Sequence, residues 1–136
     1  MCGFVISSGS DSRQNVINST NAIKYRGPDK TNYYFDEYNR IYIGHNRLSI
    51  LDDEYGGQPY FSNDKKIILL FNGEIYNYKT LKEDLQNLNI KFYSKNSDTE
   101  VLLKGYEYYG TEIFNKIDGP FACAILDFKK KNYNFR

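Results

Sequence analysis

The chain has 136 residues, of which 40% are hydrophobic and 17% aromatic, so we expect one domain with a packed core rather than a disordered chain. Eighteen Lys and Arg residues against seventeen Asp and Glu leave a net charge of +1, which excludes a basic surface for nucleic acid. The longest strongly apolar run, residues 67–71, is too short to cross a membrane, and no secretory signal begins the chain. Two cysteines do not indicate a disulfide framework, so the cytoplasm is the expected location.

The first half of the chain is predicted to contain one strand, one helix and one hairpin. Residues 3–8 form a short apolar run bounded by a polar turn, which is typical of a buried strand. Apolar residues at helical spacing predict a modest amphipathic helix over residues 12–25. Residues 31–35 and 40–44 are rich in β-formers, so we expect two strands joined by the short turn between them.

The clearest predicted strand, residues 65–71, follows a loop over residues 52–59 and is itself followed by Asn72-Gly73. Asn-Gly is a common hairpin signal. However, leucines recur at spacings of four and three over residues 78–88, which predicts a helix. Because a helix rather than a returning strand comes next, a two-residue hairpin at Asn72-Gly73 fits poorly.

The last part of the chain is predicted to add a helix and two strands. Ser97 and Glu100 have the spacing of a capping box, so a helix should start there and run to Gly110. Alternation over residues 121–125 predicts a buried strand, and residues 133–136 look like the opening of another. Strands and helices are mixed without a regular βαβ rhythm, which favours a single α+β domain with antiparallel sheet.

Cys2 directly follows the start methionine. Removal of that methionine would leave a thiol and a free α-amine on the same residue. An α-amine has a pKa near 7.7–8.0, so part of it is neutral at physiological pH. A thiol beside a neutral amine has its own general base, which is the arrangement of N-terminal-nucleophile enzymes.

Several other polar residues have plain structural interpretations. Arg47 could form a surface ion pair of little energetic value, and Asp98 could favour its helix N-terminus through the helix dipole. His45, the one histidine, is expected to be a hydrogen-bonded structural group, since no second metal ligand or triad partner is evident. Cys123 is expected to be a buried core thiol. The sequence therefore predicts no metal site.

Six ordered motifs together resemble the class II glutamine amidotransferase domain. They read MCGF at the start, then RGPD, HNRLSI, FNGEIYNY, SDTEVLL and DGPFACAILD. RGPD, HNRLSI and NGEIYN are similar to the asparagine synthetases of the glutamine-hydrolysing kind rather than to other branches. The resemblance covers essentially the whole chain, residues 1–136. It implies the α+β four-layer αββα sandwich of N-terminal-nucleophile hydrolases, with two antiparallel sheets between helical layers.

The resemblance implies three catalytic residues. Cys2 would be the nucleophile that attacks the side-chain amide carbon of glutamine, with its α-amine moving the proton. Asn72 would offer its side-chain N–H, and Gly73 its backbone N–H, to the oxyanion of the tetrahedral intermediate. Glycine suits position 73 because no Cβ obstructs the approach of the backbone to substrate.

The resemblance also implies a binding site for the zwitterionic end of glutamine. Arg47 would hold the α-carboxylate through its planar guanidinium. Asp98, with help from Glu74, would receive the α-ammonium. The backbone of the segment that follows the arginine would form one wall of the pocket: Arg47, Leu48, Ser49, Ile50 and Leu51.

The reaction that these residues imply is the hydrolysis of L-glutamine to glutamate and ammonia through a Cys2 thioester, with no metal or organic cofactor. In the family, ammonia passes to a synthetase domain that uses ATP and Mg²⁺, and nothing in this sequence resembles that domain. The resemblance therefore implies a glutaminase domain that is incomplete at its C-terminal end. A synthetase domain in cis or in trans is the expected partner, and neither nucleic acid nor a membrane is expected.

Two other functions stay open from the sequence. The chain could bind glutamine without hydrolysing it, as a non-catalytic remnant. It could also be the glutaminase half of an amidotransferase with a different ammonia acceptor. Ammonia release from glutamine would separate the first of these from the main interpretation.

Overall fold

The first sheet contains three antiparallel strands in the order β1-β3-β2. The structure is a computed structural model that describes residues 2–9, 13–48, 57–130 and 132–135. The bounds of the three strands are Gly3–Ser8 for β1, Ile41–Arg47 for the central β3 and Lys30–Asp36 for β2. In the register, Gly3 pairs with Asn46 and Lys30 with Arg47. The start of β1, the end of β3 and the start of β2 therefore lie at the same end of the sheet.

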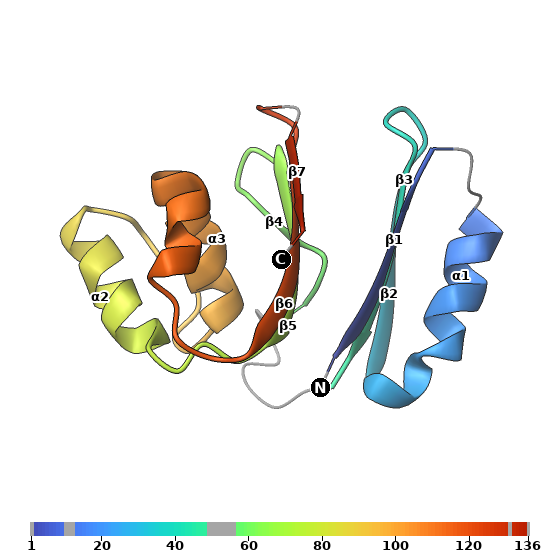
Figure 1. Cartoon of the computed structure of the whole chain (residues 1–136), viewed down its shortest axis with the longest axis horizontal. Helices are drawn as coiled ribbons and strands as arrows, with labels where there is room; N and C mark the ends of the chain where they lie inside the picture. Colours follow the sequence, from blue (N-terminus) through green and yellow to red (C-terminus); the bar gives the residue numbers. More distant parts are fainter. Residues whose placement is uncertain (1, 10–12, 49–56, 131, 136) are drawn as a thin grey trace.

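Helix α1 (Arg13–Ala22) covers the outer face of this sheet and is followed by the short 3-10 helix η1 (Lys24–Arg26) (Figure 1). Its buried residues are Val16 and Thr20. Thr20 packs so closely on Gly44 of β3 that a Cβ at position 44 would overlap the threonine hydroxyl. Glycine at this position lets the helix approach the sheet.

The second sheet contains four antiparallel strands in the order β4-β5-β6-β7. Their bounds are Tyr60–Phe61, Ile67–Gly73, Phe121–Asp127 and Asn132–Phe135. Its outer face is covered by α2 (Tyr78–Asn87), α3 (Asp98–Tyr109) and the 3-10 helix η2 (Gly110–Asn115). The layers follow one another as helix, sheet, sheet and helices, which confirms the predicted α+β four-layer sandwich (Figure 1).

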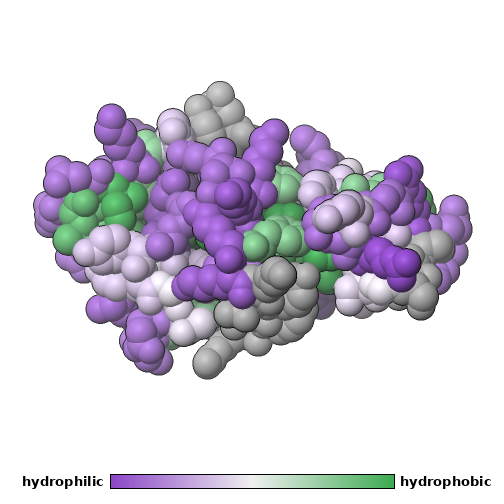
Figure 2. All heavy atoms as spheres, turned by 90° about the horizontal axis from the view of Figure 1, so that it is seen from above, coloured by the Kyte–Doolittle hydropathy of each residue, from purple (hydrophilic) through white to green (hydrophobic). Residues whose placement is uncertain are grey.

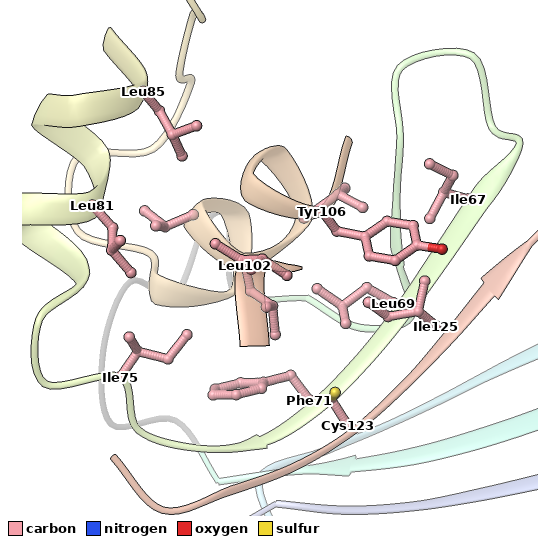
Figure 3. Packing of buried hydrophobic residues seen from close by; sticks show 13 residues of the cluster. Ile67, Leu69, Phe71, Ile75, Leu81, Leu85, Leu102, Tyr106, Cys123 and Ile125 are labelled. Carbon is pink, nitrogen blue, oxygen red and sulfur yellow. The ribbon is translucent and has the colours of Figure 1, made fainter. Parts of the chain in front are cut away.

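The two faces of β5 divide the core into two clusters. Ile67, Leu69 and Phe71 point toward the helices, where they pack with side chains of α3 such as Leu102 and Tyr106 (Figure 3). Ile68 and Leu70 point the other way and pack between the sheets, in a cluster completed by Ile41, Ile43, Ala124 and Leu126. Seen from above, hydrophobic residues show near the middle of the molecule among mostly hydrophilic ones (Figure 2). Strand alternation therefore shows which residues face the other sheet.

Most predicted elements are present, and three details differ. Strand β5 runs beyond its predicted end at residue 71 and includes Asn72 and Gly73, which pair with Ala122 and Phe121 on β6; as expected, they form no two-residue hairpin. Strand β3 runs on to Arg47, beyond the predicted end at residue 44. The two-residue strand β4 was not predicted, because so short a segment has no readable alternation.

The predicted capping box is only half formed. Ser97 Oγ accepts a hydrogen bond from the Glu100 backbone N–H at 3.2 Å, as expected for an N-cap. The Glu100 carboxylate does not return to Ser97. It is fully buried and accepts hydrogen bonds from the backbone N–H groups of Tyr93 and Ser94 at 2.9 and 2.8 Å. It thus fixes the segment before α3 onto the helix.

Among the described residues, no helix is both long enough and apolar enough to cross a membrane.

Candidate active site

One end of the sandwich collects the strand ends that carry the predicted site residues. Cys2 and the start of β1 lie there, and β3 ends there with Arg47. In Figure 1 this is the lower end, where β1 begins. Strand β5 also ends there, since Gly73 pairs with Phe121 at the start of β6. The fold therefore brings residues from both sheets to one place.

Cys2 is half-buried and is held from two sides. Its Sγ lies 3.8 Å from the backbone carbonyl oxygen of Leu48, to which the thiol donates a weak hydrogen bond. Its own carbonyl oxygen accepts a hydrogen bond from Arg26 Nε at 3.3 Å. The predicted nucleophile thus lies beside Leu48, the residue that directly follows Arg47.

Arg47 is the last residue of β3 and is only 5% exposed, so the surface ion pair considered from the sequence is wrong. Alternation with Ile41 and Ile43 places its side chain on the face of β3 that meets the other sheet. Its backbone carbonyl accepts a hydrogen bond from the Asp29 N–H at 3.1 Å. Gly27 lies against the same strand end, where a Cβ would overlap the carbonyl of Asn46.

Asn46 fixes the end of β3 from the opposite face. It is fully buried, donates from Nδ2 to the Thr20 carbonyl at 2.7 Å and accepts from Thr31 Oγ1 at 2.8 Å. The Asn46 side chain, directly before Arg47, therefore joins β3 to helix α1 and to strand β2. This arrangement limits how far the arginine backbone can move.

His45 lies on the same face of β3 as Arg47 and is 0% exposed. Neither ring nitrogen has a hydrogen-bond partner among the residues that the structure describes, so the prediction of a hydrogen-bonded structural group finds no direct protein partner there. Burial, together with the positive charge of Arg47, lowers the pKa of His45 to about 4. The imidazole is therefore neutral at physiological pH.

Asn72 and Gly73 end β5 on opposite faces. Alternation with Ile68 and Leu70 places the Asn72 side chain between the sheets, and its Oδ1 is buried without a partner among the described residues. At Gly73, a Cβ would overlap the Pro120 carbonyl oxygen and lie 2.6 Å from Phe121 Cα. Packing against β6 therefore requires glycine here, in addition to the substrate approach considered from the sequence.

Asp98 and Glu74 meet where β5 ends and α3 begins. Asp98 Oδ2 accepts a hydrogen bond from the Ile75 backbone N–H at 3.3 Å, which holds the first residue of α3 against the residue after Glu74. Burial raises the pKa of Asp98, and the negative charge of Glu74 raises it further. The two carboxylates form an acidic position beside the end of the strand that carries Asn72.

Ser49, Ile50 and Leu51, which the resemblance assigns to one wall of the pocket, lie outside the described residues. No group of three or more His, Cys, Asp or Glu side chains in the described part of the chain could hold a metal ion. The sequence reasoning missed the contact of Arg26 with Cys2 and of Asp29 with Arg47. The RGPD motif, a tight turn with a cation and a carboxylate, was the signal that could have indicated them.

A family model for the glutamine amidotransferase domain matches residues 1–135. The chain belongs to this family. Asparagine synthetase [glutamine-hydrolyzing] 1 of Bacillus subtilis (strain 168) is 40% identical over 132 residues, which are 92% of this chain and 20% of that protein. Asparagine synthetase [glutamine-hydrolyzing] 3 of Arabidopsis thaliana is 34% identical over 138 residues, which are 98% of this chain and 23% of that protein. The recognition of a class II amidotransferase domain of asparagine synthetase type is thus confirmed.

These relatives are much longer than the amidotransferase chain described here, which spans 20% and 23% of their lengths. A solved structure of glutamine phosphoribosylpyrophosphate amidotransferase from B. subtilis, complexed with ADP and GMP, is similar in fold with a TM-score of 0.75. It is 18% identical, and the match covers 94% of this chain and 35% of that one. This likeness supports the fold, and no ligand of that structure is transferred to this chain.

Proposed function

We propose that this amidotransferase domain hydrolyses L-glutamine to glutamate and ammonia through a thioester on Cys2. The observation that carries the proposal is the placement of Cys2 and Arg47 at one end of the sandwich, with Cys2 Sγ 3.8 Å from the carbonyl of the residue after Arg47. Asn72 of the second sheet ends its strand at the same end. Attack on an amide requires a nucleophile and a donor for the oxyanion, and the cation would hold the substrate carboxylate.

The first step forms the thioester. With Met1 removed, the neutral α-amine of Cys2 takes the thiol proton as sulfur attacks the amide carbon. The carbonyl oxygen becomes an oxyanion that the Asn72 side-chain N–H and the Gly73 backbone N–H stabilise. The protonated α-amine then gives its proton to the leaving nitrogen, the C–N bond breaks, and ammonia leaves.

The second step returns the enzyme to its starting state. Water attacks the thioester carbon, with the α-amine of Cys2 as the base, and the C–S bond breaks to give glutamate and the free thiol. The same two N–H groups stabilise the second oxyanion. This sequence of steps consumes one water molecule and needs no oxidant or reductant.

Substrate recognition is proposed to use opposite charges at the two ends of the amino-acid head. Arg47 pairs with the α-carboxylate, where two parallel N–H groups match two oxygens. Asp98 and Glu74 receive the α-ammonium. Burial raises the pKa of Asp98, and a bound ammonium would favour its ionised form. Complementary charge therefore accounts for selection of a free amino acid rather than of an amide within a peptide.

The ammonia is proposed to serve asparagine synthesis, because the similar proteins from B. subtilis and A. thaliana are named asparagine synthetases. The acceptor would be activated with ATP and Mg²⁺ by a synthetase domain in cis or in trans. The glutaminase half itself would need no metal or organic cofactor.

Ammonia and glutamate production from L-glutamine tests the proposal. We expect both products in equal amounts from the wild-type chain and none from Cys2→Ala. Cys123→Ala is the matched control, because that cysteine lies in the core on the helical side of the second sheet. Glutamine binding without ammonia release by the wild-type chain would instead support a non-catalytic glutamine-binding domain.

A further inference from the structure

Two side chains from different sheets have buried polar atoms that lack a hydrogen-bond partner in the described part of the chain. They are His45, through both ring nitrogens, and Asn72, through Oδ1. Buried polar atoms in native proteins are nearly always paired with protein or with ordered water. Two such groups therefore call for a common explanation if they lie near each other and are chemically complementary.

The fold places both side chains in the layer between the sheets and toward the same end. His45 follows Ile41 and Ile43 by alternation on β3, and Asn72 follows Ile68 and Leu70 on β5. Ile43 and Leu70, the residues that precede them on these faces, belong to one buried cluster. His45 and Asn72 each lie two residues nearer the end of their strand than Ile43 and Leu70. The imidazole and the amide therefore lie in the same part of the layer between the sheets.

Neighbours within the first sheet do not supply a partner for His45. In the register, His45 lies between Phe4 of β1 and Asn32 of β2. Phenylalanine has no polar atom to offer. The Asn32 Nδ2 group already donates to the Gln58 carbonyl at 2.9 Å. Neither residue makes a hydrogen bond to a ring nitrogen of His45, and the imidazole faces the opposite sheet, from which a partner can come.

Donor and acceptor are complementary. Burial keeps the pKa of His45 near 4, so at neutral pH one ring nitrogen keeps its hydrogen as a donor and the other accepts. Asn72 Oδ1 is an acceptor. The two groups make no direct hydrogen bond. One water molecule that accepts from the ring N–H and donates to Asn72 Oδ1 would satisfy that oxygen and one of the two ring nitrogens. Buried waters in proteins typically bridge otherwise unsatisfied polar groups in this way.

We propose that His45 is a positioning residue for Asn72: its ring N–H, acting through one buried water, holds Asn72 Oδ1 in the interior and so keeps Nδ2 turned toward the reacting carbonyl. The inference rests on the proposed function, because the donor role of Asn72 belongs to it. An amide that turned over would present its oxygen to the oxyanion and repel it. Fixing the amide therefore favours the transition state without touching substrate.

A double-mutant cycle tests this role. His45→Leu should lower kcat about tenfold and change the glutamine KM less than about twofold, since the coupling acts on the oxyanion donor. His45→Gln, which keeps an N–H donor, should recover most of the loss. In an Asn72→Ala background, His45→Leu should have no further effect. An equal loss in both backgrounds, or a change confined to KM, would overturn the proposal.

A second measurement does not depend on catalysis. The chain has one histidine, so ¹⁵N-histidine labelling gives the ring signals of His45 alone. We expect one protonated and one unprotonated nitrogen at pH 7, and a shift of these signals in Asn72→Ala. Asn18→Ala, on the exposed face of α1, should leave them unchanged.

The two measurements separate the failures. If the wild-type chain releases no ammonia, the proposed function fails, and the labelled histidine still decides whether the link to Asn72 exists. If the ring signals of His45 do not change in Asn72→Ala, the proposal is overturned. This labelling experiment does not use His45→Leu, so it decides the matter even if that variant does not fold.

Discussion

Arg26 Nε donates a hydrogen bond to the backbone carbonyl oxygen of Cys2 at 3.3 Å. The same side chain packs on the next residue, since a Cβ at Gly3 would lie 3.2 Å from Arg26 Cδ. Three residues after Arg26, the Asp29 N–H donates to the Arg47 carbonyl at 3.1 Å. One turn of the chain therefore supports both the proposed nucleophile and the proposed carboxylate-binding cation.

We predict that Arg26→Ala lowers kcat/KM for glutamine hydrolysis about tenfold, because a hydrogen bond from a charged group contributes roughly 1.5–3 kcal/mol. The reason is loss of the fixed backbone at Cys2. Steady-state ammonia release measures it. Arg13→Ala is the control, because Arg13 forms an exposed ion pair with Glu37. Equal losses from both substitutions would contradict a specific role for Arg26.

Arg47→Lys is predicted to raise the glutamine KM about tenfold with a smaller change in kcat. Lysine keeps the charge but cannot offer the two parallel N–H groups of a guanidinium. Asn72→Ala should show the opposite pattern, a kcat lower by about 10²–10³ with a smaller change in KM. Initial rates over a range of glutamine concentrations separate the two parameters. Similar effects of both substitutions on both parameters would count against the proposed division of roles.

Gly73→Ala is predicted to destabilise the fold by about 2 kcal/mol, since overpacking against atoms that cannot move typically costs 1–3 kcal/mol. The added Cβ would meet backbone atoms of Pro120 and Phe121. Urea denaturation without glutamine measures the free energy of unfolding. Gly57→Ala is the matched control, because a Cβ there has no neighbour within 4 Å. If Gly73→Ala is as stable as the control, strand β6 can shift to make room for the added Cβ, and the prediction is wrong.

The buried His45 is predicted to make stability depend on pH. Its pKa is about 4 in the folded chain against an ordinary 6.5, so between these values the unfolded chain binds more protons. Stability therefore falls as pH is lowered through this range, by about 2 kcal/mol between pH 7 and pH 5. Wild type and His45→Gln should differ in this slope, measured by urea denaturation at both pH values. The carboxylates, including Asp98 with its raised pKa, are common to both proteins. If wild type and His45→Gln lose the same free energy of unfolding between pH 7 and pH 5, the low pKa of the buried His45 is contradicted.

Local patterns predicted most of the helices and strands. Alternation and leucine spacing predicted the strands around residues 3–8 and 121–125 and the helix after Asn72-Gly73. The ordered motifs predicted the family, which the family model confirms. These features are encoded within short windows of sequence, where spacing alone distinguishes a helix from a strand.

What local patterns could not give depends on contacts between distant parts of the chain. Arg26 is 24 residues from Cys2, and no spacing rule links a turn to the start of a strand. The carboxylate of Glu100 is used by Tyr93 and Ser94 rather than by its own N-cap, because the preceding segment folds back onto it. His45 is buried without a hydrogen-bond partner among the described residues because the second sheet packs over it, which no local pattern indicates.

The state of the N-terminus tests the central claim most directly. Intact-mass analysis and ammonia release are measured on the same sample, before and after reaction with a glutamine analogue that has an electrophilic carbon in place of its side-chain amide. We predict that active material has lost Met1 and that one equivalent of analogue attaches to Cys2 as activity disappears. Full activity with Met1 still present, or attachment to Cys123 instead, would contradict the account.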